Sequence, residues 1–177
     1  ADWIEIYNPT ASSYNLSGMS LTDSLEEPYR WTFPLGTSIA ANGYLIVWCD
    51  AGQPPSTTSG PGLNTGFNLS GDSGAVYLIS NAGQVLDSVE YGTRVADLSI
   101  GRSGGQWRLL ASLTPAAANS GPAALGSVTG LRLNEWMASS NEGDDWFELY
   151  NTSAQPVELA ALYITDDLSI QGQTAFS

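Results

Sequence analysis

The chain has 177 residues, with 18 acidic side chains, five basic ones that are all arginine, no histidine, and a formal net charge of −13. This composition excludes histidine-dependent catalysis and lysine Schiff-base chemistry. It also disfavours nucleic acids and anionic membrane surfaces as partners, because both bind to basic faces.

Short runs of alternating apolar and polar residues, separated by Gly, Pro and Asn turns, predict an all-β chain. The 19 glycines and nine prolines agree with this, and no long segment keeps a helical apolar period. Residues 50–61 carry no strand pattern and predict a long surface loop. We expect strands near residues 2–7, 16–22, 29–33, 43–49, 75–80, 84–91, 98–102 and 106–110, which suggests a two-sheet sandwich.

Cys49 is the only cysteine, and it ends a continuous apolar run that starts at Tyr44. A disulfide within the chain is therefore impossible. No cation lies near Cys49 in the sequence to lower the pKa of its thiol. We expect a buried, unreactive thiol in a central strand.

The tryptophans fall into two groups. Trp31, Trp48 and Trp107 lie inside strand patterns and are expected in the core, whereas Trp3 and Trp146 are candidates for an exposed face. Exposed aromatic side chains are typical of sugar-binding platforms. Packing or contact between domains is the favoured interpretation here.

An internal repeat with an offset of 143 residues runs through the sequence. Residues 1–33 align without gaps to residues 144–176, and 11 of the 33 positions are identical. The identical residues in the first copy are Asp2, Trp3, Glu5, Tyr7, Asn8, Ala11, Leu16, Thr22, Asp23, Leu25 and Phe33. Ile4 and Ile6 are replaced by Phe147 and Leu149, as expected for one apolar strand face with tolerant packing.

The offset also predicts how the chain is divided. A strand-like run, LRLNEWM, precedes the second copy, and residues 131–143 have no counterpart ahead of residue 1. We expect residues 1–119 to form a near-complete sandwich that lacks its own first strand. Residues 120–130 form a linker rich in Gly, Ala, Ser and Pro. Residues 131–177 then supply the first strands of a second copy.

Ordered motifs along the first copy carry a family resemblance. They are DWIEIYNP, LSG, LTDS, WTFPLGTSIAANGYLIVW, FNLSGDSGAVYLI, GQVLDSVEYG, IGR and TPAAANSG. Together they resemble the lamin tail domain, especially its bacterial and archaeal secreted versions, over roughly residues 1–119. The later segment LRLNEWMASSNEGDDWFELYN resembles the opening of the same family, through Asn134, Glu135, Met137 and Ala138.

The resemblance implies an immunoglobulin-like β-sandwich that acts as a non-catalytic module, with no catalytic residues and no cofactor. In prokaryotes such domains occur in large extracellular proteins, often in tandem or beside hydrolase domains. In nuclear lamins the domain contacts proteins and DNA, but DNA binding is not carried over because this chain lacks a basic surface.

We therefore expect an extracellular or cell-surface structural or adhesive module from a tandem-repeat protein. Its partners would be proteins, either further copies of itself or neighbouring domains of the same type, with no nucleic acid and no membrane insertion. The alternative is a ligand- or glycan-binding accessory domain of a larger secreted hydrolase.

Carboxylates are the only abundant reactive groups. Glu5 and Asp23 recur as Glu148 and Asp166, but a glycosidase needs two carboxylates across a sugar cleft. Glu5 lies within a strand pattern. Asp23 follows a strand end, where an aspartate usually caps a turn by accepting backbone N–H bonds. No catalytic residue is predicted.

A denser set of oxygen-bearing residues lies in the second copy: Asn141, Glu142, Asp144, Asp145, Asp166 and Asp167. Calcium binds such clusters, but the spacing matches neither an EF-hand loop nor an RTX-type repeat. A solvated acidic loop is the favoured interpretation and Ca²⁺ is the alternative, so no metal ligand is assigned.

Residues 131–139 have the sequence of the strand that the first copy lacks. An open sheet edge exposes unpaired backbone groups and an apolar groove, and strand addition satisfies both. We expect Leu131, Leu133, Trp136 and Met137 to anchor this donor strand. The strand would fold back onto its own first copy or insert into a neighbouring chain, and the second route gives a head-to-tail assembly. An ordinary tandem array without exchange is the alternative.

Overall fold

The computed structural model describes the chain except for residues 140, 142, 161, 171 and 177. The chain divides into two compact units, Ala1–Gly121 (unit 1) and Pro122–Ser177 (unit 2). Apart from one short 3-10 turn, every regular element among the described residues is a strand, so the all-β prediction is confirmed. No helix in this part of the chain is long and apolar enough to cross a membrane.

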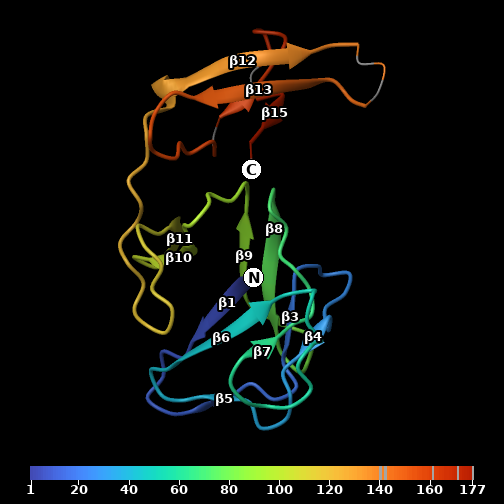
Figure 1. The fold of residues 1–177 in the computed structure, drawn as a ribbon, viewed down its shortest axis with the longest axis vertical. Helices are drawn as coiled ribbons and strands as arrows, with labels where there is room; N and C mark the ends of the chain where they lie inside the picture. The colour runs from blue at the N-terminus through green and yellow to red at the C-terminus, as the bar shows by residue number, and fades with distance from the viewer. Residues whose placement is uncertain (140, 142, 161, 171, 177) are drawn as a thin grey trace. The chain divides into compact units, whose positions relative to one another are not determined.

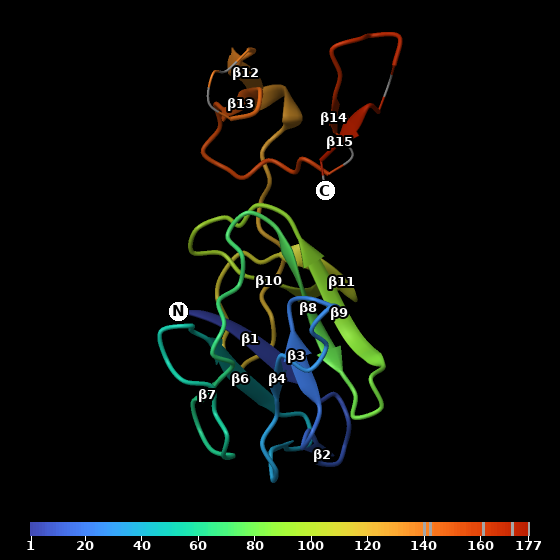
Figure 2. The ribbon, with the colours of Figure 1, turned by 90° about the vertical axis from the view of Figure 1, so that its right-hand side faces the viewer.

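Unit 1 is an immunoglobulin-like sandwich built on a four-stranded sheet, β4-β3-β8-β9, and a three-stranded sheet, β1-β6-β7 (Figures 1 and 2). All neighbouring strands in these sheets are antiparallel except β6 and β7, which run parallel. The bounds are β1 (Asp2–Tyr7), β3 (Ser20–Thr22), β4 (Trp31–Thr32), β6 (Tyr44–Cys49), β7 (Leu63–Asn64), β8 (Gly74–Ile79) and β9 (Val85–Tyr91). Two smaller pairs join β2 (Tyr14–Asn15) to β5 (Ser38–Ile39) and β10 (Ile100–Ser103) to β11 (Gln106–Leu109).

One apolar cluster draws residues from both main sheets. Its buried members are Leu16, Leu21, Trp31, Phe33, Ile39, Val47, Cys49, Leu63 and Phe67. Burial of this size is the main term that stabilises a domain of about 120 residues. Ile4 and Ile6 of β1 pack against the cluster but are only partly buried, so the core is incompletely covered along β1.

The apolar run of β6 does not make a strand that is buried on both faces. Val47 and Cys49 are fully buried, whereas Trp48 is 42% exposed, so the expectation of a core position for Trp48 is wrong. The strand alternates strictly, and its outward positions happen to be aromatic or aliphatic as well. Trp31 is in the core as expected.

Trp107 is also not a core residue, because 38% of it is exposed. Its indole N–H donates to the carbonyl of Ser88 at 2.9 Å, and the Arg102 guanidinium lies 4.5 Å from its ring centre. These contacts place Trp107 on the surface of β9, where it attaches the β10–β11 pair to the four-stranded sheet.

The predicted surface loop at residues 50–61 is confirmed, and one buried side chain shapes it. The Asn64 side-chain amide donates to the carbonyls of Asp50, Gln53 and Pro54 at 3.0, 3.1 and 3.2 Å, and its oxygen accepts from the Asp50 N–H at 3.0 Å. Asn64, in a strand that the sequence did not predict, is thus a main anchor of this loop. Asn68 and Trp31 add further bonds, to the Ala51 N–H and the Ser56 carbonyl.

Unit 2 consists of two strand pairs and a short turn. The elements are η1 (Val128–Gly130), β12 (Leu131–Met137), β13 (Trp146–Asn151), β14 (Tyr163–Ile164) and β15 (Thr174–Ala175). β12 pairs with β13, and β14 pairs with β15, both antiparallel.

Equivalent residues in the two copies of the repeat make the same hydrogen bonds and strand pairs. The Asn8 amide donates to the Ser12 carbonyl, and Asn151 donates to the Gln155 carbonyl, both at 2.8 Å and 143 residues apart. The β3–β4 pairs Ser20–Thr32 and Leu21–Trp31 return as the β14–β15 pairs Tyr163–Ala175 and Ile164–Thr174. The hydroxyl of Thr22 donates to the carbonyl two residues on, and Thr165 does the same. The aligned sequences therefore build the same local structure twice.

Unit 2 has no buried residue among those the structure describes. Leu133 and Trp136 of β12 are 57% and 70% exposed, and Phe147 of β13 is 39% exposed. A two-stranded hairpin without a core is marginal at best in water. The apolar face of β12–β13 therefore needs a cover to be stable.

Candidate interaction surfaces

The outer face of β1–β6 carries an aromatic ladder. Trp3 lies opposite Trp48 and Tyr7 opposite Tyr44 in the strand register, and the two tyrosine rings stack at 4.8 Å. Residues directly opposite each other on antiparallel strands share a face and contact each other. Tyr7 and Trp48 are each more than 40% exposed, so part of this aromatic surface faces solvent.

Glu5 sits in the middle of this face, opposite Ile46. Its carboxylate accepts a hydrogen bond of 2.5 Å from the Ala116 N–H, which holds the segment after β11 against β1. Burial raises the pKa of the Glu5 carboxyl above its ordinary value of 4.5, and the bond from Ala116 partly offsets this. The structural role expected for Glu5 is thus what the geometry shows.

Because the folded state raises this pKa, Glu5 stabilises unit 1 most when protonated, and that contribution is lost as pH rises through the folded pKa. We expect the melting temperature of Glu5→Gln to exceed that of the wild type near neutral pH. The difference should be at most about 3 °C, because solvent screens a half-exposed group. The difference should shrink as pH falls below 4.5. Thermal melts of both proteins across this pH range check it; a gap that widens on acidification would contradict it.

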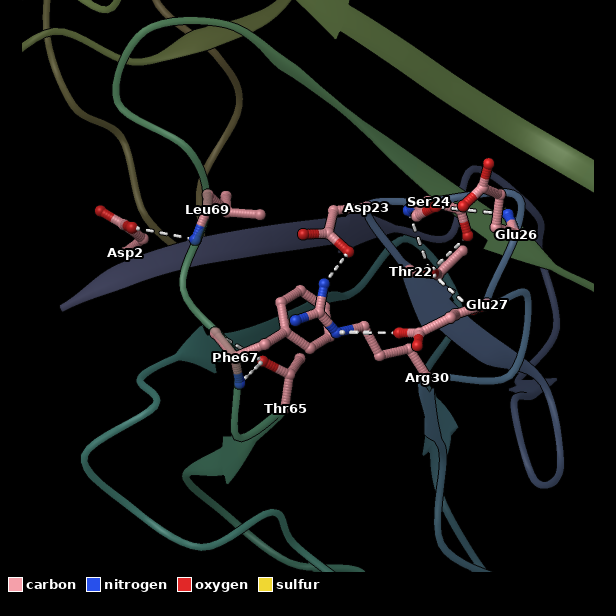
Figure 3. Close-up of polar contacts among 10 residues, drawn as sticks. All are labelled: Asp2, Thr22, Asp23, Ser24, Glu26, Glu27, Arg30, Thr65, Phe67 and Leu69. Carbon is pink, nitrogen blue, oxygen red and sulfur yellow. Dashed lines mark hydrogen bonds and ion pairs between the residues drawn. The ribbon is translucent and has the colours of Figure 1, made fainter.

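A charged cluster lies where β3 ends (Figure 3). Arg30 forms an ion pair with Asp23 and a second, at 3.8 Å, with Glu27, while its guanidinium lies 4.6 Å from the Phe67 ring centre. The expectation that Asp23 caps the turn is wrong. Thr22 does this: its hydroxyl oxygen accepts from the Ser24 N–H at 3.1 Å. Asp23 is instead the counter-ion of Arg30.

Two further arginines of unit 1 form ion pairs. Arg94 pairs with Asp2 at 2.9 Å, and Arg102 pairs with Asp87 at 2.6 Å. Asp2 additionally accepts from the Leu69 N–H at 3.3 Å. Three of the four arginines of unit 1 are thus neutralised by carboxylates, which leaves little positive charge on the described surface of this unit.

Cys49 is fully buried, as predicted. Burial raises the pKa of its thiol to about 11, although a hydrogen bond with Thr65 opposes this. We expect Cys49 in the folded chain to react with an aromatic disulfide reagent at pH 8 at least ~100-fold more slowly than in the denatured chain. An assay of the aromatic thiolate that the reagent releases, run with and without denaturant, measures both rates. Equal rates would show that the strand end opens readily.

The best-formed hollow of the described chain lies beside β5 and holds about 340 Å³. It is lined by Gly36, Thr37, Ser38, Leu45, Ser59, Gly60 and Leu63, none of which is ionisable. The lining has hydroxyl groups on Thr37, Ser38 and Ser59 but no acidic or basic side chain that could activate them.

The acidic set of unit 2 is only partly visible, because Glu142 lies outside the described residues. Asp145 accepts from the Ser139 N–H at 3.0 Å. The Ser169 hydroxyl and N–H both donate to Asp167, at 2.7 and 2.8 Å, which lowers the pKa of that exposed carboxyl. No three metal-binding side chains meet among the described residues. Calcium binding stays an untested alternative.

β1 is the end strand of its sheet. Among the described residues it pairs with β6 alone, so its other edge presents a row of backbone N–H and C=O groups. In unit 2, β12 occupies the corresponding edge of β13, the strand that matches β1 in the repeat. The donor role predicted for residues 131–139 stays a prediction, since in the structure this run pairs with β13.

A β-bulge at Asn134 decides which side chains β12 offers. The register shifts between Leu133 and Glu135, so Leu133 lies opposite Leu149 and Trp136 lies opposite Phe147. One inserted residue changes which face each following side chain points to. Leu133 and Trp136 therefore share the apolar face of the hairpin.

The same shift separates Met137 from the face of Leu131 and Leu133. Met137 lies opposite Trp146, on the outer face. The strict alternation assumed from the sequence holds only up to Leu133. Of the four predicted anchors, Leu131, Leu133 and Trp136 lie together and Met137 does not.

Two residues of the aromatic ladder, Tyr44 and Trp48, were not predicted as surface residues. They lie four positions apart along β6 and face a pair in β1, Trp3 and Tyr7, with the same spacing. Each pair becomes recognisable only when the register between β1 and β6 is known.

Comparison with known proteins gives one match. The sequence model of the Lamin Tail Domain family matches residues 1–93, more than half of the chain. No curated protein and no solved structure matches the chain significantly. The family is an immunoglobulin-like protein-interaction domain and is generally non-enzymatic, which agrees with the sandwich of unit 1 and the ion-paired, structural roles of its carboxylates. The chain belongs to the lamin tail domain family.

Proposed function

We propose that this chain is a structural or adhesive module of an extracellular tandem-repeat protein, and that its copies associate by β-strand complementation. Residues 131–177 are proposed to begin a second lamin tail domain. The chain works through its surfaces and sheet edges, and contact with further copies of the same domain is its main activity.

The observation that supports this most is the unequal pairing of two equivalent strands. β13 has a partner, β12, at the edge that β1 leaves unpaired, and β1 has a partner, β6, that β13 lacks among the described residues. Among the described residues, β12 thus pairs at the strand edge that has no partner in unit 1. A contact of this kind joins one copy to the next and builds rings or filaments, depending on whether it closes.

The charge of the chain sets the conditions for association. Each chain carries a net charge of −13, so the chains repel each other at low ionic strength. Salt screens this repulsion while it leaves apolar burial intact. Association driven by sheet edges and apolar side chains should therefore strengthen as salt is added, and the acidity keeps dilute copies soluble.

Sedimentation of the full chain over roughly a hundredfold range of concentration tests the proposal. We expect the average mass to rise with concentration and with salt. The double substitution Leu133→Lys with Trp136→Lys should weaken association at least tenfold, because it places two charges on the face to be covered.

A matched control replaces two equally exposed apolar residues outside the hairpin, Tyr163→Lys with Leu168→Lys, and should leave association nearly unchanged. A chain that stays monomeric at every concentration and salt would overturn self-association. An equal loss in both double variants would show only a general effect of charge.

A second function is favoured by the aromatic ladder. Trp48 and Tyr7 form part of a flat, half-exposed aromatic surface on the outer face of β1–β6, and such surfaces bind sugar rings by stacking. The chain would then be an accessory domain of a secreted hydrolase. A glycan array with the wild type and Trp48→Ala separates the two functions: binding that the substitution abolishes would support this one.

A further inference from the structure

We propose that the β12–β13 hairpin of one chain takes the place of β1 on the β6 strand of a second chain. This inference rests on the proposed self-association and specifies its geometry. The exchanged sheet has the order β12-β13-β6-β7, in which β13 keeps every partner that β1 has and β12 enters beside it.

The first argument is the identity of the residues that β6 and its surroundings recognise. In unit 1, Asp2 binds Arg94 and Leu69, Trp3 faces Trp48, Glu5 binds Ala116 and Tyr7 stacks on Tyr44. The residues at the matching positions of β13 and the turn before it are Asp145, Trp146, Glu148 and Tyr150. Every side chain of β1 that makes a specific polar or aromatic contact is therefore repeated unchanged.

Asn8, the residue directly after β1, is also repeated unchanged in the second copy, as Asn151. Asn8 is buried, and its side-chain amide donates to the carbonyls of Ile39 and Ala40 at 3.2 and 2.9 Å. Asn151 stands at the equivalent position and already holds the same local turn, with its amide on the Gln155 carbonyl. It can enter the Asn8 position without refolding its own loop.

Only the core-facing positions differ. Ile4 and Ile6 make apolar contacts with the cluster, and Phe147 and Leu149 replace them. Ladder hydrogen bonds lost by β1 are regained by β13, so the backbone exchange is close to neutral. The difference lies at Phe147, which is larger than Ile4, whereas Leu149 has the same size as Ile6.

β12 supplies the net gain. Leu133 and Trp136 lie on the same face as Leu149 and Phe147, and both are more than half exposed in unit 2. When β13 lies on β6, this face points to the core of the second copy, and β12 covers the edge where β1 leaves it open. Burying these two large apolar side chains favours exchange.

The central carboxylate of the hairpin already has a hydrogen-bond donor within the hairpin. The Asn134 side chain, at the bulge, donates to the Glu148 carboxylate. Glu148 therefore does not need the Ala116 amide that Glu5 uses. The hairpin moves as a unit whose central carboxylate is already hydrogen-bonded, which limits the polar cost of the transfer.

A cross-linking experiment on the full chain tests the register. A chain with Ile46→Cys is mixed with a chain carrying Glu148→Cys, since Ile46 faces Glu5 in β1 and would face Glu148 after exchange. Cys49 stays in place because it is buried. After mild oxidation we expect the disulfide between the two chains at least tenfold above that of a control pair, Ile46→Cys with Tyr163→Cys.

A locked variant gives an independent readout. Glu5→Cys with Ile46→Cys in one chain ties β1 to β6 once oxidised, and mass spectrometry confirms that the bond is internal. Exchange requires β1 to leave, so the oxidised variant should lose association by at least tenfold, and reduction should restore it.

The outcomes separate this inference from the proposed function. Association that persists in the oxidised, locked variant, together with background cross-linking, would overturn the exchange and leave strand addition at the edge of β1. Absence of association in the wild type would overturn both. Cross-linking above control with loss of association on locking would establish the exchange.

Discussion

Phe33→Ala is expected to destabilise unit 1 by about 4 kcal/mol, which lowers its melting temperature by roughly 15 °C. The Phe33 side chain is 1% exposed, and its ring packs edge-on against Trp31 at a centroid distance of 4.7 Å. Removing it leaves a cavity in the middle of the apolar cluster, and neither main sheet can close over it without losing its register. Calorimetry of dilute wild type and variant measures the effect.

The repeat provides the matched control. Phe176 occupies the equivalent position in unit 2, is only partly buried, and has its aromatic contact with Phe147 at 6.3 Å. Phe176→Ala should cost less than about 1 kcal/mol at the same dilution, because it leaves no enclosed cavity. Similar losses for both variants would mean that unit 2 has a core of its own, although none of its described residues is buried.

Asn8→Ala is expected to cost about 3 kcal/mol, or roughly 10 °C in melting temperature. The Asn8 side chain donates to three carbonyls, those of Ser12, Ile39 and Ala40, and accepts from the Thr10 N–H. Alanine leaves these groups without a partner in a site that is 3% exposed. The turn between β1 and β2 and its attachment to the β5 region then loosen together.

Asn151→Ala tests whether the cost comes from burial. Asn151 makes the equivalent local bonds to Gln155 and Ser153, but these are exposed to solvent. Water replaces them, so we expect a loss of less than about 1 kcal/mol. If Asn8→Ala were equally mild, the three carbonyls would not be held by Asn8 in solution.

The sequence predicted the fold of unit 1 well where a strand has one clear apolar face. β1 was predicted with its observed bounds, and β6 within one residue, because their periods and flanking turns are unambiguous. β2, β5 and β7 were missed: each has two residues, which is too short for a period to appear. The repeat was readable because identical residues recur at one fixed offset.

The direction of the side chains was predicted less well than the strands. Trp48 was assigned to the core because a run of apolar residues does not reveal which of its two faces is covered. The face on which Met137 lies could not be predicted, because a single bulge residue is invisible in a pattern of period two. Asp23 was read as a cap, since its partner Arg30 comes close only after the intervening turn has folded. Each of these depends on contacts made in space rather than along the chain.

Amide hydrogen exchange of the full chain, compared between dilute and concentrated samples, tests the central claim most directly. The account predicts that on association β12 and β13 gain protection while β1 loses it, because the hairpin replaces β1 on β6. Protection of all three strands that does not change with concentration, in a sample whose mass does rise, would contradict the claim that sheet edges carry the function of this protein.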